Sequence, residues 1–236
     1  MYLTRFRLNA ARPGARKLIA SSQALHAAVM SSFPDLLPSA AGRPRVLWRL
    51  DRNAAAELLL YVVSPGRPDL THLVEQAGWP AAAASGTPGW QTYGYAPFLD
   101  RLDKGGIWNF RLTANPVHSV RVRDGQPTKR TAHVTTQHQI EWLLGRQEVG
   151  GFRIQEKPQE RRRTERGDLH QLVVRDQRSL EFRKTGSTGP VTIKTVTYDG
   201  RLEVTDADAL RKVLTEGLGK AKAYGCGLMT LAPIST

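Results

Sequence analysis

The segment 217–228, GLGKAKAYGCGL, carries the residue types best suited to bind phosphate. Glycine has no Cβ, so main-chain N–H groups in such a loop can approach an anion closely, and Lys220 and Lys222 add positive charge. The spacing matches neither GxxxxGK[ST] nor GxGxxG, which argues against a nucleoside triphosphate or a dinucleotide. We therefore predict a loop that binds a nucleic acid backbone; a turn whose glycines serve only local geometry is the alternative. The glycines concerned are Gly217, Gly219, Gly225 and Gly227.

Histidines and the single cysteine are further candidates for chemistry. His118, His133 and His138 fall in different expected elements and have no cluster of carboxylates beside them, so we do not expect a zinc site. Cys226 is the only cysteine, which excludes an internal disulfide and any cysteine-based zinc site. We expect it to pack as a small hydrophobic residue, and we expect no metal and no cofactor.

The charge of the chain favours a polyanionic partner. The 236 residues include 34 Lys and Arg against 21 Asp and Glu, a formal net charge of +13. A hydrophobic content of 40% is typical of a folded protein with one large core or two small ones. No run approaches the roughly 18 apolar residues of a membrane helix, and the first residues lack a signal-peptide pattern. We expect a soluble protein that acts in the cytoplasm and binds no membrane.

The first part of the chain has the apolar spacing of a strand, a helix and two strands. Residues 1–8 alternate as a half-buried strand does, and a helix is expected from Ser22, with Ser21 or Ser22 as its N-cap. The next expected elements are strands at 46–51 and 56–64 and a short helix at 70–76. This order matches the first half of a ferredoxin-like unit. Residues 78–97 are rich in Ala, Gly and Pro, lose periodicity and are expected to contain loops or a linker.

A second series of strands and helices follows from about residue 106. The expected strands are 107–112, 117–122, 169–175, 180–183, 192–198 and 201–204, and the expected helices are 136–146 and 207–216. We therefore predict an α+β protein with two tandem ferredoxin-like domains, 1–98 and 106–236. Each is expected to have a four-stranded antiparallel sheet covered by helices on one face.

Six sequence blocks form a pattern that composition alone does not give. In chain order they are MYLTRFRLN at the start, VLWRLDR from Val46, FRLTANP at 110–116, IEWLLGR from Ile140, YDGRLEV from Tyr198 and GLGKAKAYGCGLMTLAP near the end. Together they resemble the CRISPR-associated precursor-RNA endoribonucleases of type I-E systems, called CasE or Cse proteins. Only residues 78–105 have no clear counterpart. The resemblance implies two RRM-like domains that cut CRISPR repeat RNA on the 3′ side of its stem-loop without metal, leaving a 2′,3′-cyclic phosphate and a 5′-hydroxyl.

The same resemblance implies which residues are catalytic. Metal-independent cleavage uses the RNA's own 2′-hydroxyl as nucleophile, so the protein must manage two proton transfers and the charge of the phosphorane. His26 stands where the family has its catalytic histidine, and histidine exchanges protons near neutrality, although a lone helical histidine is more often a surface residue. Gln23 replaces a tyrosine of the relatives; it cannot ionise but can hydrogen-bond the phosphate or the 2′-oxygen. Arg183 and Lys184 match a basic pair that stabilises the transition state, with a solvated hairpin tip as the alternative.

A dense run of arginines is a second candidate surface for RNA. Its members are Arg161, Arg162, Arg163 and Arg166, with Glu160 and Glu165 between them. Arginine pairs bidentately with phosphate and can track an A-form stem, although a mixed-charge run is also typical of a solvated face. Trp90, Tyr93 and Tyr95 are able to stack on bases or to anchor a loop, and we leave them unassigned. Trp48, Trp108 and Trp142 are expected in the core.

Three functions remain open at this point. The first is an endoribonuclease that releases guide RNAs and keeps the product hairpin as a subunit of the type I-E surveillance complex, Cascade. The second is a non-catalytic module that binds an RNA hairpin, because Gln23 removes one expected active-site group. The third is a basic protein associated with ribosomes or tRNA. In each case RNA is the expected partner; for the first, other Cascade subunits are partners too, and the free chain is expected to be a monomer.

Overall fold

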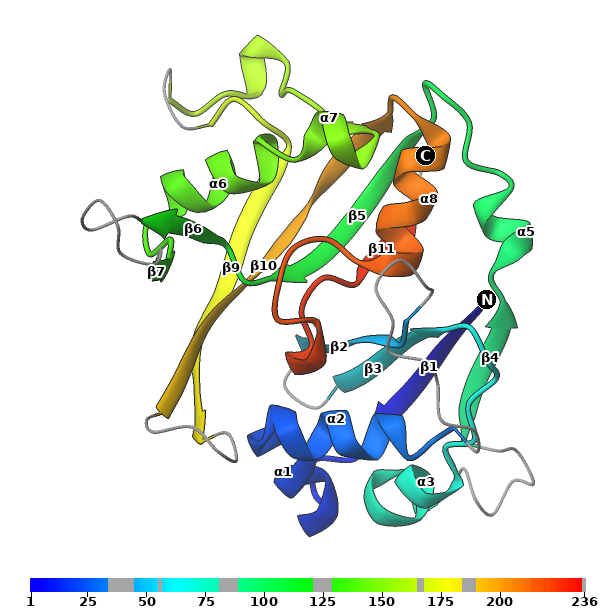
Figure 1. Cartoon of the computed structure of the whole chain (residues 1–236). Helices are drawn as coiled ribbons and strands as arrows, with labels where there is room; N and C mark the ends of the chain where they lie inside the picture. Colours follow the sequence, from blue (N-terminus) through cyan, green and yellow to red (C-terminus); the bar gives the residue numbers. More distant parts are fainter. Residues whose placement is uncertain are drawn as a thin grey trace. The chain divides into compact units, whose positions relative to one another are not determined.

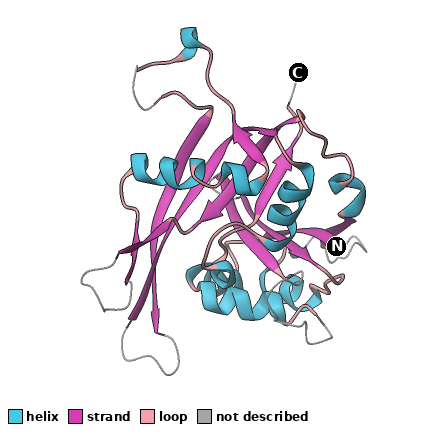
Figure 2. Cartoon of the chain, turned by 45° about the horizontal axis from the view of Figure 1, so that its top comes forward, coloured by secondary structure: helices cyan, strands magenta, loops and turns pink. Residues whose placement is uncertain are grey.

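A computed structural model gives the fold of the chain. It describes residues 1–33, 45–54, 57–80, 89–120, 129–164, 168–183 and 190–234. The chain divides into two compact units, each with helices and strands (Figure 2). The first unit consists of Met1–Arg101, Thr215–Gly217 and Lys222–Leu228; the second consists of Leu102–Leu214, Leu218–Ala221 and Met229–Thr236.

The first unit contains a four-stranded antiparallel sheet. Its strands are β1 (Tyr2–Leu8), β2 (Leu47–Ala54), β3 (Glu57–Ser64) and β4 (Trp90–Gly94), in the order β2-β3-β1-β4. All pairs are antiparallel, with Phe6 opposite Leu60 and Trp48 opposite Val62. This strand order is ferredoxin-like, as the sequence predicts.

Three helices of the first unit pack on one face of this sheet (Figure 1). They are α1 (Pro13–Ala20), α2 (Ser22–Met30) and α3 (Thr71–Ala77). Leu25 from α2 and Leu73 from α3 join Phe6 and Trp48 in a common core. The expected N-cap of α2 is confirmed, because Oγ of Ser21 accepts a hydrogen bond from the backbone N–H of Ala24 at 3.2 Å. The sequence pattern does not predict the helix α1.

The stretch 78–97, predicted to contain loops or a linker, also contains regular structure that the sequence pattern does not predict. Residues 90–94 form β4, which pairs with β1, and the short helix α5 (Ala96–Leu99) follows. β4 is an edge strand and largely exposed, so its sequence lacks the alternation of apolar and polar residues that identifies a half-buried strand. Tyr95 is buried and stacks on Phe98, whereas Tyr93 is exposed. Residues 81–88 lie outside the described part of the chain.

The second unit contains a larger antiparallel sheet. Its strands are β5 (Ile107–Ala114), β8 (Phe152–Ile154), β9 (Leu172–Arg183), β10 (Pro190–Val204) and β11 (Met229–Ala232), ordered β11-β5-β10-β8, with β9 also paired to β10. A hairpin of β6 (Val117–Val120) and β7 (Lys129–Ala132) stands apart from this sheet. The helices are α6 (Thr136–Leu144), α7 (Gln147–Gly150), the 3-10 turn η1 (Gln159–Arg161) and α8 (Ala207–Glu216). With β11, β5, β10 and β9 side by side, this unit is ferredoxin-like too.

Two predicted strand pairs of the second unit are in fact two long strands. The expected break in 169–183 coincides with a register shift opposite Thr195 and Thr197, where Asp176 has a φ of 53°. This is a bulge within β9 rather than an end of a strand. The expected break at Gly200 also lies inside a strand. A Cβ there would be 2.4 Å from the carbonyl oxygen of Gln171. Gly200 therefore does not mark a turn; it lets the backbone near Gln171 pack closely against β10.

The C-terminal part of the expected second domain 106–236 is shared between the units. Residues 215–217 and 222–228 belong to the first unit, and this segment includes the 3-10 turn η2 (Lys222–Tyr224). η2 packs against α2 and β2. Most of the glycine-rich loop therefore lies in the same unit as His26.

Candidate functional site

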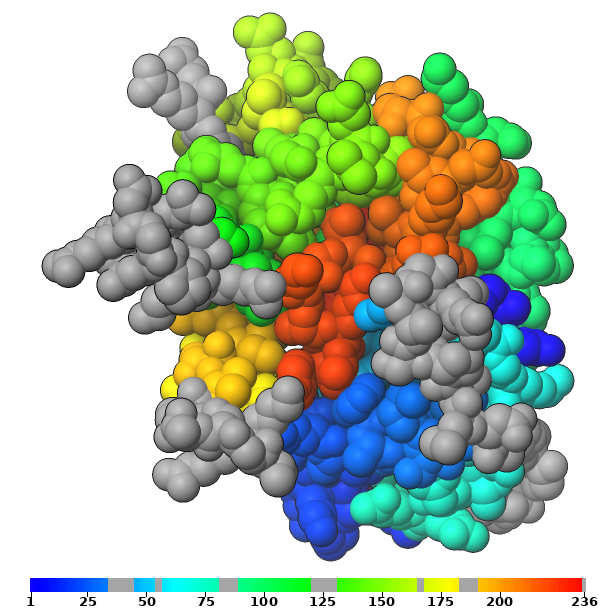
Figure 3. Space-filling view, viewed as in Figure 1, coloured from blue at the N-terminus to red at the C-terminus, as the bar shows by residue number. Residues whose placement is uncertain are grey.

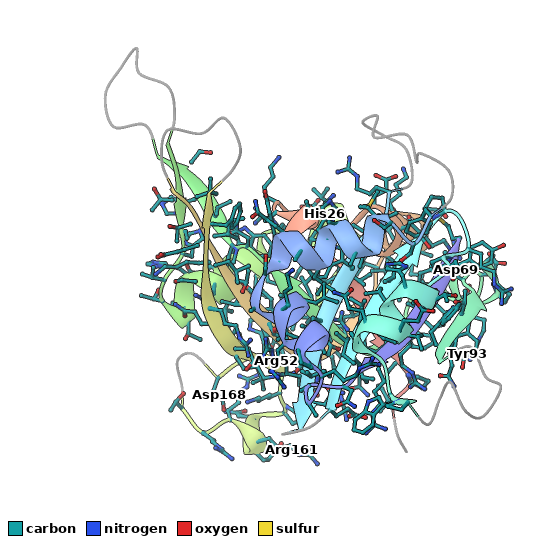
Figure 4. The ribbon with its side chains drawn as sticks, turned by 90° about the horizontal axis from the view of Figure 1, so that it is seen from below. His26, Arg52, Asp69, Tyr93, Arg161 and Asp168 are labelled. Atoms are coloured by element: carbon teal, nitrogen blue, oxygen red, sulfur yellow. The ribbon has the colours of Figure 1, made fainter. Side chains whose placement is uncertain are left out.

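His26 lies half-buried on α2 in the first unit (Figure 4). The indole Nε1–H of Trp48 donates a hydrogen bond to its Nδ1 at 3.3 Å. Burial removes water from the imidazole and so lowers the pKa of His26 below the ordinary value of 6.5. The side chain is therefore neutral near pH 7, and one of its two ring nitrogens is engaged by the protein.

Gln23 lies one helical turn before His26 on the same helix and is exposed. Residues three apart on a helix lie on neighbouring parts of its surface, so a single phosphate group can contact both side chains. The structure thus brings together two of the four residues that the sequence predicts to be catalytic.

The other two expected catalytic residues belong to the second unit. Arg183 is the last residue of β9, and its backbone pairs with Pro190 of β10. The side chain of Arg183 and the whole of Lys184 lie outside the described residues. The role of this basic pair stays a prediction.

The four glycines of the loop all have a positive φ, between 81° and 89°. Three also lack room for a side chain: a Cβ would be 2.9 Å from Leu47 at Gly217, 3.0 Å from Trp142 at Gly219 and 2.7 Å from Trp48 at Gly225. Left-handed backbone and close packing each favour glycine. Local geometry therefore explains these glycines whether or not the loop contacts RNA.

The two lysines of the loop have different surroundings. Nζ of Lys222 donates a hydrogen bond to the backbone carbonyl of Glu216, the last residue of α8, at 2.6 Å. A cation there stabilises the carbonyl end of a helix. Lys220 is exposed and is the better placed of the two to meet a phosphate. In the first unit the loop segment borders α2, as Figure 3 shows where orange-red residues meet blue ones.

A buried ion pair holds the end of this loop against the first sheet. Arg49 and Asp51 on β2 are joined by two hydrogen bonds, Nε to Oδ1 at 2.6 Å and Nη2 to Oδ2 at 2.9 Å. Nη1 of Arg49 also donates to the backbone carbonyl of Leu228 at 2.9 Å, and its guanidinium lies 5.4 Å from the ring centre of Tyr61. Nothing in the sequence pattern separates this arginine from those of a solvated strand.

Cys226, in the same segment, is fully buried, as expected. Burial disfavours the thiolate and raises the pKa of its thiol to about 12. The cysteine is therefore a packing residue and not a nucleophile.

The arginine run has mixed surroundings within the second unit. Arg162 donates to the carbonyl oxygen of Lys157 at 3.0 Å and pairs with Glu156 at 3.2 Å. The side chains of Arg161 (Figure 4) and Arg163 are exposed. The backbone N–H of Arg163 donates a hydrogen bond to Oδ2 of Asp168 at 2.8 Å. Arg166 is outside the described residues. Two of the four predicted RNA-binding arginines are thus open to a ligand.

The structure brings together three histidines that the sequence predicts in different elements. The ring centres of His118 and His133 are 4.4 Å apart, and those of His133 and His138 are 5.7 Å apart. Burial, then the neighbouring imidazoles, lower the pKa of His133. Even so, within the described ranges no group of three or more His, Cys, Asp or Glu residues is placed to hold a metal ion.

No helix among the described residues is long and apolar enough to cross a membrane.

Comparisons with known proteins place the chain in a family. Residues 1–233 match the family described as CRISPR associated protein. The chain is 30% identical over 236 residues to the CRISPR-associated endoribonuclease Cse3 of Thermus thermophilus, covering 99% of this chain and 100% of the relative. It is 31% identical over 199 residues to the CRISPR system Cascade subunit CasE of Escherichia coli, covering 80% and 89% of the two chains.

Solved structures agree with these sequence matches. A structure of the endoribonuclease Cse3 bound to a 19-nucleotide RNA has a TM-score of 0.75 at 30% identity, covering 99% of this chain and 100% of that chain. A structure of Thermus thermophilus Cse3 bound to an RNA that represents a pre-cleavage complex has a TM-score of 0.74 at 29% identity, with 98% of both chains covered. The chain belongs to the CRISPR associated protein family, among the CasE-like endoribonucleases of type I-E systems.

Proposed function

We propose that this protein is a metal-independent endoribonuclease that cleaves CRISPR repeat RNA on the 3′ side of its stem-loop. The observation that carries the proposal is His26: a neutral, half-buried imidazole on a helix that is fixed at one ring nitrogen and packs against the turn Lys222–Tyr224 of the same unit. The relatives that match the whole chain support it, because one is named an endoribonuclease and is solved with RNA that represents a pre-cleavage complex.

The proposed chemistry needs no group beyond the RNA and the protein. The 2′-oxygen attacks the adjacent phosphorus and the bond from phosphorus to the 5′-oxygen breaks, giving a 2′,3′-cyclic phosphate and a 5′-hydroxyl. The 2′-oxygen loses one proton and the 5′-oxygen gains one, so no water is consumed. His26 acts at the reacting atoms, and Gln23 hydrogen-bonds the phosphate or the 2′-oxygen. Arg183 and Lys184 stabilise the extra negative charge of the phosphorane.

Binding of the hairpin depends on charge and shape. Lys220 and the exposed arginines Arg161 and Arg163 contact phosphates, which position the RNA without selecting its sequence. The deep major groove of an A-form stem excludes side chains, so recognition relies on the shape of the hairpin and on its unpaired flanks. Because the Escherichia coli relative is a Cascade subunit, we propose that this protein keeps its product hairpin in the type I-E surveillance complex, in the cytoplasm.

Substitution of His26 by alanine tests the proposal. Cleavage of a repeat-hairpin RNA should slow at least about a hundredfold, because the group that acts on the reacting atoms is lost. Affinity for the hairpin should be nearly unchanged, because a neutral side chain contributes little to phosphate binding. The His138→Ala variant serves as the control: the side chain of His138 is exposed, and this variant should cleave the hairpin at the rate of the wild type. Equal cleavage by the His26→Ala variant would rule out His26, and tight binding without any wild-type cleavage would favour the non-catalytic module.

A further inference from the structure

The hydrogen bond between Trp48 and His26 determines which ring nitrogen carries a proton. An indole N–H is only a donor, so the nitrogen that faces it, Nδ1 of His26, must accept. A neutral imidazole has one donor and one acceptor nitrogen. With Nδ1 as the acceptor, the proton of neutral His26 is on Nε2.

The indole is held in this position by its surroundings. Trp48 has 2% of its surface exposed and packs in the core of the first unit with Leu25 and Val62. Gly225 covers its six-membered ring so closely that a Cβ would be 2.7 Å from Cζ3. A buried ring in such close contact cannot turn its N–H away from the imidazole without disturbing the core.

We propose that Trp48 is a positioning residue that keeps the proton of neutral His26 on Nε2, so that the histidine presents to the RNA an N–H donor and no lone pair. This inference rests on the proposed function and makes it more specific. In the other tautomer the proton is on Nδ1, so the Nδ1–H of His26 and the Nε1–H of Trp48 would be two donors facing each other. The buried indole N–H would then have no acceptor. His26 thus acts on the scissile phosphate or the leaving 5′-oxygen as a hydrogen-bond donor that keeps its own proton. The proton that the 2′-hydroxyl loses passes to solvent water, and the 5′-oxygen takes one from water, so the step balances.

The burial of His26 agrees with this assignment. A protonated imidazole is a donor at both nitrogens and would also oppose the indole N–H. Desolvation lowers the pKa of His26 and therefore favours the neutral form that the hydrogen bond requires.

The tautomer is measurable in the free protein, without RNA. The sample is the whole chain labelled with 15N at histidine, and long-range 1H–15N spectra near pH 8 distinguish the two neutral tautomers. The His26→Ala variant identifies the signals of His26. We expect the Nε2–H pattern in the wild type and a clear population of the Nδ1–H form in Trp48→Phe, which keeps an aromatic ring and removes the donor. An unchanged pattern in Trp48→Phe would overturn the proposal.

A second tryptophan provides a matched control. Trp142 is also buried, at 5% exposed, but its Nε1–H has no hydrogen-bond partner within the described part of the chain. Trp142→Phe therefore removes the same atoms without removing a hydrogen bond. Single-turnover cleavage should slow roughly two- to tenfold in Trp48→Phe beyond any change in Trp142→Phe, with the same affinity for a hairpin that contains a 2′-deoxy nucleotide at the cut. Equal rates in both variants would contradict a positioning role.

The donor role is tested with Trp48 intact by changing the histidine itself. In His26→Gln the side-chain NH2 replaces the Nε2–H, yet an amide cannot accept a proton as a base. We expect this variant to cleave roughly tenfold faster than His26→Ala. Equal rates for glutamine and alanine would overturn the donor role. If the wild type does not cleave at all, the proposed function fails, while the NMR experiment still decides the tautomer.

Discussion

Gly225 lies directly against the six-membered ring of Trp48. A Cβ on this glycine would be 2.7 Å from Cζ3 of the indole, and its backbone has a φ of 81°. Through this contact the glycine-rich loop covers the residue that hydrogen-bonds His26. The loop therefore supports the candidate catalytic residue as well as supplying positive charge.

Substitution of Gly225 by alanine should destabilise the protein. Both the strained backbone and the contact with Trp48 oppose a methyl group, so we expect the free energy of unfolding to fall by about 2–4 kcal/mol. Urea unfolding followed by circular dichroism measures this change. Gly66 is the control, because a Cβ there has no atom within 4 Å. If Gly66→Ala and Gly225→Ala were equally stable, the close packing of the loop on Trp48 would be contradicted.

Loss of Arg49 should lower the free energy of unfolding more than loss of a surface arginine. Its removal leaves Asp51 charged and buried and frees the carbonyl of Leu228, so Arg49→Ala should lower the free energy of unfolding by about 3–5 kcal/mol. The exposed Arg67 is the control, and Arg67→Ala should change the free energy of unfolding by less than about 0.5 kcal/mol. The same urea titration compares the two. A change below about 1 kcal/mol in Arg49→Ala would show that the pair does not hold the loop.

Substitutions of Lys220 and Lys222 should affect different properties, RNA affinity in the first case and the free energy of unfolding in the second. Lys220 is exposed, so Lys220→Ala should weaken binding of an uncleavable 2′-deoxy hairpin and reduce the slope of log Kd against log salt by about one. Lys222 binds the end of α8, so Lys222→Ala should mainly lower the free energy of unfolding, by about 1 kcal/mol. Binding measured across a potassium chloride series, together with urea unfolding, checks both. The opposite assignment of the two effects would refute this division of roles.

The pH dependence of cleavage should follow the neutral form of His26. Burial lowers the pKa of His26 below 6.5, so the neutral fraction is nearly complete above that pH and declines as the pH falls through the lowered pKa. Protonation puts a second N–H on Nδ1, which breaks the hydrogen bond with Trp48 that positions the ring. The single-turnover rate at saturating RNA should therefore stay level from pH 8 to about pH 6.5 and decrease in more acidic solution. His26→Gln should lack this decrease. A wild-type rate that increases on acidification would show that the imidazolium is the active form.

Much of the fold was predictable because local patterns and the final structure agree. The helix 207–216 has the same bounds in the sequence prediction and in the structure, and Ser21 caps α2 as its side chain suggests. Predictions failed where tertiary contacts override local pattern. The exposed edge strand β4 depends on pairing with β1, and Gly200 lies in a strand because other backbone atoms approach it.

The candidate site was predictable in its residue types more than in its arrangement. His26 and Gln23 share a helix, so their proximity follows from sequence spacing. The sequence predicts Trp48 in the core, and the structure confirms this. Its hydrogen bond to His26, 22 positions away, depends on how α2 packs on β2. The same limit applies to His118 and His133, whose contact follows from the register of the β6–β7 hairpin.

The most direct test of the account is cleavage of a synthetic repeat hairpin in EDTA. One RNA is unmodified, and the other carries a single 2′-deoxy nucleotide immediately before the expected cut. We predict that only the unmodified RNA is cleaved and that its 5′ fragment ends in a 2′,3′-cyclic phosphate. Cleavage of both RNAs, or of neither until a divalent metal is added, would contradict attack by the 2′-hydroxyl without metal.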